Sequence, residues 1–186
     1  MVKKAVYIHG FAGSVHSETV GNLHKYYPEV EWVALEVAHH AGESVGKINA
    51  YLLANPDVDL LMGSSLGGFY VLCADFAGTK LVINPSLHPM STLKPCVGVN
   101  KYRGRRENGD TEFKLTMQDV FAFSRFKPKD TPATICHYTE HDQVLGEEAR
   151  REYPKFFHCS EMTRDLRSHF MDEHYIHTKL AEIINH

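Results

Sequence analysis

The sequence lacks a long apolar run, an excess of basic charge and paired cysteines, and each absence excludes a class of protein. No stretch approaches the roughly 20 apolar residues that span a bilayer, and the short run before His9 does not read as the core of a signal peptide. The formal net charge is −3, which provides no global field for a nucleic acid or a membrane surface. The four cysteines are widely spaced and form no C-x-x-C pair. We therefore expect reduced thiols in a cytoplasmic protein.

The overall composition is that of an ordinary globular domain. The chain has 186 residues, of which 43% are hydrophobic and 23% charged. A chain of this length buries about 70% of the surface that its unfolded form exposes, so it needs no disulfide or metal to hold a core. We expect one domain over residues 1–186.

Short apolar runs alternate with longer helical patterns along the chain. The apolar runs cover residues 6–8, 30–37, 58–62, 81–83, 133–138 and 156–159. The helical patterns cover residues 18–27, 43–54, 66–76, 145–153 and 171–184. Runs rich in Val, Ile and Leu suit strands that are buried on both faces, and crossover helices between them make the strands parallel. The sequence therefore predicts an α/β fold with a doubly wound, mostly parallel six-stranded sheet.

Residues 85–132 interrupt this alternation, because a plain crossover helix needs far fewer residues. The segment contains a basic stretch at 101–106, a possible strand at 113–115 and an apolar helix at 117–123. We expect a small insertion that packs over one edge of the sheet and forms a partial lid.

The strongest chemical signal follows the third apolar run. Residues 63–67 read Gly-Ser-Ser-Leu-Gly, which fits G-x-S-x-G with Ser65 at the centre and a helical pattern directly after it. A sharp strand-to-helix turn lifts such a serine above the edge of the sheet, and small neighbours permit the strained backbone. The pattern predicts a nucleophilic Ser65; the alternative is an ordinary turn rich in glycine and serine.

A second signal, His9-Gly10-Phe11, directly follows the first apolar run. A turn at the carboxyl end of a strand can aim a backbone N–H at the reacting group, so we expect the N–H groups of Phe11 and Leu66 to form an oxyanion hole. The alternative is a tight turn with an incidental histidine.

The loop after the fifth apolar run carries the candidate acid, Asp142. A carboxylate at the carboxyl end of a parallel strand lies on the same rim as Ser65 and can orient a catalytic histidine. Glu140 is the rival, although we expect it to end the strand. The non-catalytic alternative is that Asp142 caps a helix or is a solvated carboxylate in a loop.

The base should follow the acid if the chain order is Ser, Asp, His. The later histidines are His158, His169, His174, His177 and His186. We expect His158 in a strand and both His174 and His177 in the last helix. His169 falls in the loop that opens on the active rim, so it is the predicted base.

These motifs resemble those of the α/β-hydrolases, and specifically of the small bacterial YqiA-like esterase family. The matching segments are 7–11, 63–68, 82–85, 140–144 and 168–170, in family order over nearly the whole chain. The resemblance implies strands in the spatial order 2-1-3-4-5-6 and a triad of Ser65, Asp142 and His169. Two features depart from the family pattern. The basic stretch at 101–106 has no clear counterpart, and His141 stands where a glycine is common.

The predicted function is therefore hydrolysis of carboxylic esters or acyl thioesters through an acyl-enzyme, without a cofactor. We expect the insertion to contact this small-molecule substrate. The residues expected to do so are Met117, Phe121, Arg103, Arg105 and Arg106. A basic stretch of this kind is most often a solvated loop, and that is the alternative to an anion-binding lid.

Two other functions remain open at this point: a non-catalytic binding protein on the same scaffold, and a metal-dependent hydrolase. The pair His39-His40 and the spacing of His174 and His177 could bind a metal, but the chain has no H-E-x-x-H motif and no finger spacing. We therefore expect no functional metal.

Overall fold

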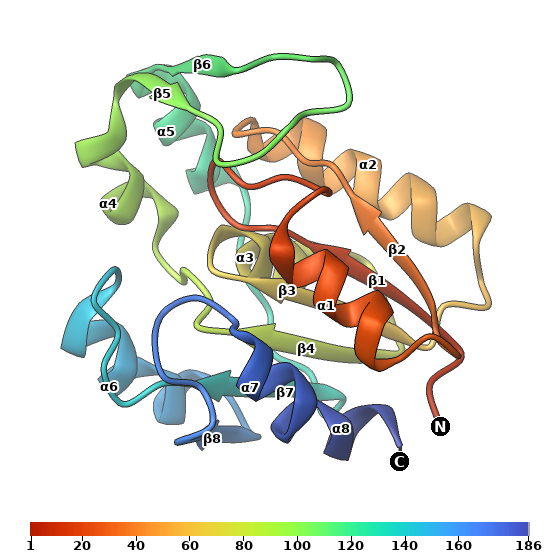
Figure 1. The fold of residues 1–186 in the computed structure, drawn as a ribbon. Helices are drawn as coiled ribbons and strands as arrows, with labels where there is room; N and C mark the ends of the chain where they lie inside the picture. Colours follow the sequence, from red (N-terminus) through yellow and green to blue (C-terminus); the bar gives the residue numbers. More distant parts are fainter. Residues whose placement is uncertain (186) are drawn as a thin grey trace.

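A computed structural model describes residues 1–185 and shows one six-stranded sheet flanked by helices (Figure 1). The strands are β1 (Lys4–Ile8), β2 (Glu31–Leu35), β3 (Leu60–Ser64), β4 (Thr79–Ile83), β7 (Thr134–Tyr138) and β8 (Ser160–Met162). Their order is β2-β1-β3-β4-β7-β8, and every neighbouring pair is parallel. The predicted doubly wound sheet and its strand order are confirmed.

Helices cover both faces of this sheet, which explains why its strands are apolar on both sides. The helices are α1 (Glu18–Tyr26), α2 (Ala41–Ala54), α3 (Leu66–Cys73), α6 (Gly146–Phe156), α7 (Glu173–His177) and α8 (Lys179–Ile184). In β1, Val6 and Ile8 join the core under α2, α3 and α6, whereas Ala5 and Tyr7 join the core under α1, α7 and α8. Figure 1 shows α1, α7 and α8 on the near face of the sheet.

Two predicted elements differ from the structure. The last strand is β8, not residues 156–159, because α6 continues through Pro154 to Phe156 and Tyr153 packs against Phe157 at 6.2 Å between ring centroids. Phe156 is thus the last residue of a helix and Phe157 is its buried cap, whereas His158 and Cys159 are exposed. The last helix is divided at Thr178, whose hydroxyl donates to the carbonyl of His174 at 2.7 Å.

The insertion lies beyond the carboxyl ends of β1 and β2 (Figure 1). It comprises α4 (Pro89–Leu93), a 3-10 turn η1 (Lys94–Cys96), β5 (Gly98–Lys101), β6 (Glu112–Leu115), α5 (Met117–Ala122) and a second 3-10 turn η2 (Phe123–Arg125). β5 and β6 form an antiparallel hairpin, of which only β6 was predicted, because the short β5 alternates between exposed and half-buried residues. Leu115, Val120 and Phe123 are buried in the core under α2 and α3.

No helix among residues 1–185 combines the length and the apolar character needed to cross a membrane.

Candidate active site

Ser65 occupies a sharp turn between β3 and α3. Its backbone has φ 55° and ψ −121°, a left-handed conformation that is rare for a residue with a side chain. The turn is possible because its neighbours are glycines: a Cβ on Gly63 would lie 2.5 Å from the carbonyl oxygen of Gly67, and a Cβ on Gly67 would collide with the carbonyl oxygen of Ile8. Strain of this kind concentrates at functional sites. The strand–turn–helix context expected for a nucleophilic serine is present.

Asp142 and His169 form a buried pair beside this turn. The His169 Nδ1 and the Asp142 Oδ2 are 2.8 Å apart, and the two side chains are 2% and 3% exposed. Burial alone would raise the pKa of Asp142, but its bonds to His169 and to the N–H of Leu145 hold that pKa below its ordinary value. The ionised carboxylate fixes the imidazole through Nδ1, which leaves Nε2 as the nitrogen available for a proton transfer.

The loop that carries His169 is held by Asn84, which sequence reasoning did not single out. Asn84 follows β4 and is fully buried; its Nδ2 donates to the carbonyls of His169 at 3.0 Å and Ser168 at 3.2 Å. Its Oδ1 accepts the N–H of Thr139 at 2.9 Å. The backbone φ of 43° explains the residue type, since asparagine tolerates the left-handed region better than most residues do. One side chain therefore connects the ends of β4 and β7 with the loop of the candidate base.

The loop after β1 brings its backbone against the serine. A Cβ on Gly10 would lie 3.1 Å from the Cβ of Ser65, so any side chain at this position would push the two segments apart by a few tenths of an ångström. Phe11 and Leu66 line the same cavity as Ser65. Leu66 is the first residue of α3, where an N–H has no acceptor within the helix. The two expected oxyanion donors thus flank the serine.

His9 is a buried structural residue in this loop. Its Nδ1 donates to the carbonyl of Gly10 at 2.9 Å, and its Nε2 accepts the N–H of Val37 at 3.2 Å. Burial is the main cause that lowers the pKa of His9 to about 4, with the nearby Arg106 guanidinium acting in the same direction. A neutral His9 therefore shapes the loop and has no role as a base near neutral pH.

Arg106 does not contact the cavity, contrary to the expectation that it binds substrate. Its side chain is buried: Nε pairs with the Glu36 Oε1 at 3.2 Å, Nη1 donates to the carbonyl of Gly13 at 3.0 Å, and Nη2 donates to the carbonyl of Val37 at 2.9 Å. The N–H of Arg103 also donates to the carbonyl of Ala12 at 2.8 Å. The basic stretch therefore holds the loop after β1 in place.

A cavity of about 260 Å³ opens over Ser65 and His169. Apolar side chains that line it include Phe11, Leu93, Val144, Leu145, Phe170 and Met171. Of the residues expected to bind substrate, only Arg103 lines this cavity; its guanidinium lies 5.0 Å from the ring centroid of Phe170. Met117 and Phe121 belong to α5, away from the cavity lining, and the side chain of Phe121 is 57% exposed. Arg105 is exposed outside the cavity.

The rival acid and bases lie elsewhere. Glu140 is exposed at the end of β7. The His174 Nε2 pairs with Asp165 at 3.1 Å, the ring of His177 packs 5.0 Å from that of Tyr26, and exposed His158 pairs with Asp130. His186 lies outside the described residues.

The sheet order, the serine at the strand-to-helix turn and the buried pair of Asp142 and His169 define the α/β-hydrolase fold. Solved structures agree: Est1E from Butyrivibrio proteoclasticus has a TM-score of 0.65 at 15% identity, with 99% of this chain and 87% of that chain covered. A monoacylglycerol lipase from Paleococcus ferrophilus has a TM-score of 0.64 at 13% identity, covering 97% and 93%. The mouse alpha/beta hydrolase domain-containing protein 10 has a TM-score of 0.69 at 11% identity, covering 100% and 91%.

The model of the uncharacterised protein family UPF0227 matches residues 4–185, and the chain belongs to that family. A UPF0227 protein of Shewanella sp. (strain ANA-3) is 28% identical over 165 residues, which are 83% of this chain and 84% of that protein. The superfamily and the family expected from the motifs are confirmed.

Proposed function

We propose that this protein is a serine hydrolase that cleaves carboxylic esters through Ser65, His169 and Asp142. The observation that carries the proposal is the buried 2.8 Å contact between His169 and Asp142 on a cavity that Ser65 also lines. A carboxylate, an imidazole and a strained serine in that arrangement are the parts that activate a hydroxyl group for attack on an acyl carbon.

In the proposed reaction, the His169 Nε2 takes the hydroxyl proton of Ser65 while its oxygen attacks the acyl carbon. The N–H groups of Phe11 and Leu66 stabilise the resulting oxyanion, an effect of about 3 kcal/mol per donor. The protonated His169 then gives its proton to the leaving alcohol, and the acyl group remains on Ser65. Water, deprotonated by His169, then attacks the acyl-enzyme; the bond from the acyl carbon to the Ser65 oxygen breaks, His169 returns the proton to that oxygen, and the acid is released.

For the substrate, we infer a small acyl group attached to an alcohol or a thiol. The cavity of about 260 Å³ is slightly smaller than the roughly 300–1,000 Å³ typical of ligand pockets, which favours a short acyl chain. Arg103 on the cavity wall favours a leaving group that carries a phosphate or carboxylate, because a guanidinium binds such anions through paired N–H donors. An acyl thioester with phosphates, such as an acyl-CoA, fits this description and is the second candidate substrate.

A fluorophosphonate tests the nucleophile directly, because only an activated serine attacks phosphorus quickly. Intact-mass analysis should find one adduct, mapped to Ser65, and Ser65→Ala should remove both the adduct and ester turnover without changing the fold. Asp142→Asn should slow labelling by about 10³–10⁴-fold, whereas Glu140→Gln, the matched change in the exposed rival, should not.

Unchanged labelling of Ser65→Ala would disprove the assignment of the nucleophile. Equal slowing by both carboxylate variants would disprove the assignment of the acid. A non-catalytic binding protein, the alternative from another class, would retain a bound ester and form no adduct.

A further inference from the structure

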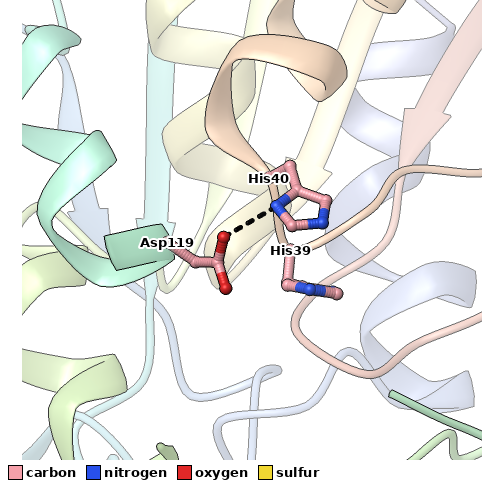
Figure 2. A group of neighbouring side chains, drawn as sticks. All are labelled: His39, His40 and Asp119. Atoms are coloured by element: carbon pink, nitrogen blue, oxygen red, sulfur yellow. Dashed lines mark ion pairs between the residues drawn. The ribbon is translucent and has the colours of Figure 1, made fainter. Parts of the chain in front are cut away.

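A second group of reactive side chains lies outside the cavity, where the insertion meets the core. His39 and His40 end the loop between β2 and α2, and Asp119 lies in the first turn of α5. Figure 2 shows the His40 ring and the Asp119 carboxylate pointing toward each other, with His39 beside them. One ligand atom from each residue lies within 4.8 Å of the other two. We propose that these three residues bind one divalent transition-metal ion, with zinc as the preferred ion.

The donor set suits such an ion, because imidazole nitrogen and carboxylate oxygen are common zinc ligands. Bonds of about 2.0–2.1 Å in a tetrahedral site place neighbouring ligand atoms about 3.4 Å apart. The His40 Nδ1 and the Asp119 Oδ1 are already 3.0 Å apart. A nitrogen of His39 lies within 4.8 Å of both atoms, so small shifts of the three side chains would close the site, and water would fill the fourth position.

The surroundings of Asp119 hold it in a position suited to metal binding. Its Oδ2 accepts the N–H of Thr116 at 2.8 Å and the hydroxyl of Thr116 at 2.6 Å, as part of the capping box of α5. The other oxygen, Oδ1, is the one that faces His40. Hydrogen bonds that orient a carboxylate ligand in this way are typical of built metal sites.

His39 provides an independent observation. Its ring stacks on Phe113 of β6, with centroids 4.4 Å apart and planes 20° apart, which restricts its orientation. Its Nδ1 is buried and has no hydrogen-bond partner among residues 1–185. A buried polar atom without a partner is costly and calls for a ligand, water or ion at that point. An ordinary ion pair of His40 with Asp119 does not account for this nitrogen.

The ion would have a structural role and would take no part in hydrolysis. None of its three ligands lines the cavity over Ser65. Two ligands belong to the core and one to the insertion, so the metal would fasten α5 to the start of α2. The proposal is therefore independent of the proposed esterase activity, and it differs from the metal-dependent hydrolase considered earlier.

Zinc binding to the untagged, chelator-treated protein tests the proposal. Titration calorimetry should show one ion per chain, and zinc should raise the Tm of the wild-type protein. Asp119→Asn retains an oxygen for the cap of α5 but is a poorer ligand. We expect Asp119→Asn and His40→Gln each to weaken binding by more than about tenfold and to lose the zinc-dependent rise in Tm.

The matched control is His174→Gln with His177→Gln, which removes the other pair of neighbouring histidines and should leave the affinity unchanged. Circular dichroism of each metal-free variant establishes that it is folded. The proposal would be overturned by no binding to the wild type, by undiminished binding to Asp119→Asn and His40→Gln, or by a loss of binding in the control variant alone.

Discussion

Arg106 of the insertion and Glu36, the residue after β2, form a buried ion pair with 3.2 Å between Nε and Oε1. The Glu36 carboxylate also accepts the N–H of Glu107, and the Arg106 guanidinium bonds to the loop that contains Gly13. Charges removed from water need partners of this kind, because the desolvation cost is large. The position of the loop after β1 therefore depends on a residue of the insertion.

The first prediction concerns this pair. Arg106→Ala should lower the free energy of unfolding by about 3–5 kcal/mol, because it leaves Glu36 buried without its partner. Urea denaturation measures the change. Arg105→Ala removes an exposed guanidinium next to it and should change stability by less than about 0.5 kcal/mol. A similar decrease in the free energy of unfolding in both variants would mean that the buried ion pair of Arg106 does not stabilise the fold.

The second prediction concerns Asn84 as a positioning residue. Asn84→Ala removes the bonds to the carbonyl of His169 and the N–H of Thr139, so the base should lose its alignment with Ser65. We expect kcat for an ester to fall at least about tenfold, with a smaller change in KM because Asn84 does not line the cavity. Asn108→Ala, an exposed asparagine of the insertion, is the control. An equal change in kcat and KM for Asn84→Ala would argue against a positioning role.

The third prediction concerns acid stability. Burial is the main cause that lowers the pKa of both His9 and His137 from 6.5 to about 4. Between these pH values the unfolded chain binds protons that the folded protein does not, so stability falls as the pH falls from about 6.5 to 4. Each histidine accounts for up to about 3 kcal/mol at the end of this window.

Urea denaturation at several pH values checks this slope. His137→Gln removes one of the two buried histidines that titrate in this window. The free energy of unfolding of the variant should therefore depend less steeply on pH between about 4 and 6.5. The His137 Nδ1 lies 2.7 Å from the hydroxyl of Tyr175, a contact that the glutamine can partly replace. Parallel pH profiles for the variant and the wild type would contradict the prediction.

The fourth prediction separates the two substrate classes. Arg103→Ala should raise KM for an acyl-CoA and leave a small neutral ester nearly unchanged, since only the former offers phosphates to the cavity wall. High salt should have the same selective effect. Arg105→Ala, which changes an exposed arginine outside the cavity, should affect neither substrate. If Arg103→Ala raises KM equally for the acyl-CoA and the neutral ester, Arg103 shapes the cavity and does not bind the anion.

The sequence predicted the sheet well because runs such as 81–83 are short, apolar and followed by helical patterns. It also placed Ser65, Asp142 and His169 at strand ends, where topology brings distant residues to one rim. It was wrong about residues 156–159, because an apolar run reads alike in a strand and in the buried end of a helix.

Tertiary contacts account for what the sequence did not predict. Arg106 was expected to contact substrate or to lie in a solvated loop, and its buried partner Glu36 follows a different strand that the sequence does not connect with it. Asn84 lies in the family-matching segment 82–85, but nothing in that segment indicates that its side chain binds the loop of His169. The contact between His40 and Asp119 joins two segments whose proximity only the folded insertion determines.

The hydrogen bonds of Asn84 join segments that leave the ribosome at very different times. Asn84 emerges first, Thr139 later and His169 last. The candidate base therefore acquires its position only after all three segments have been made. A chain cut before residue 168 would lack both carbonyls, so the buried Asn84 Nδ2 would be left without these acceptors and the fold around it would be less stable.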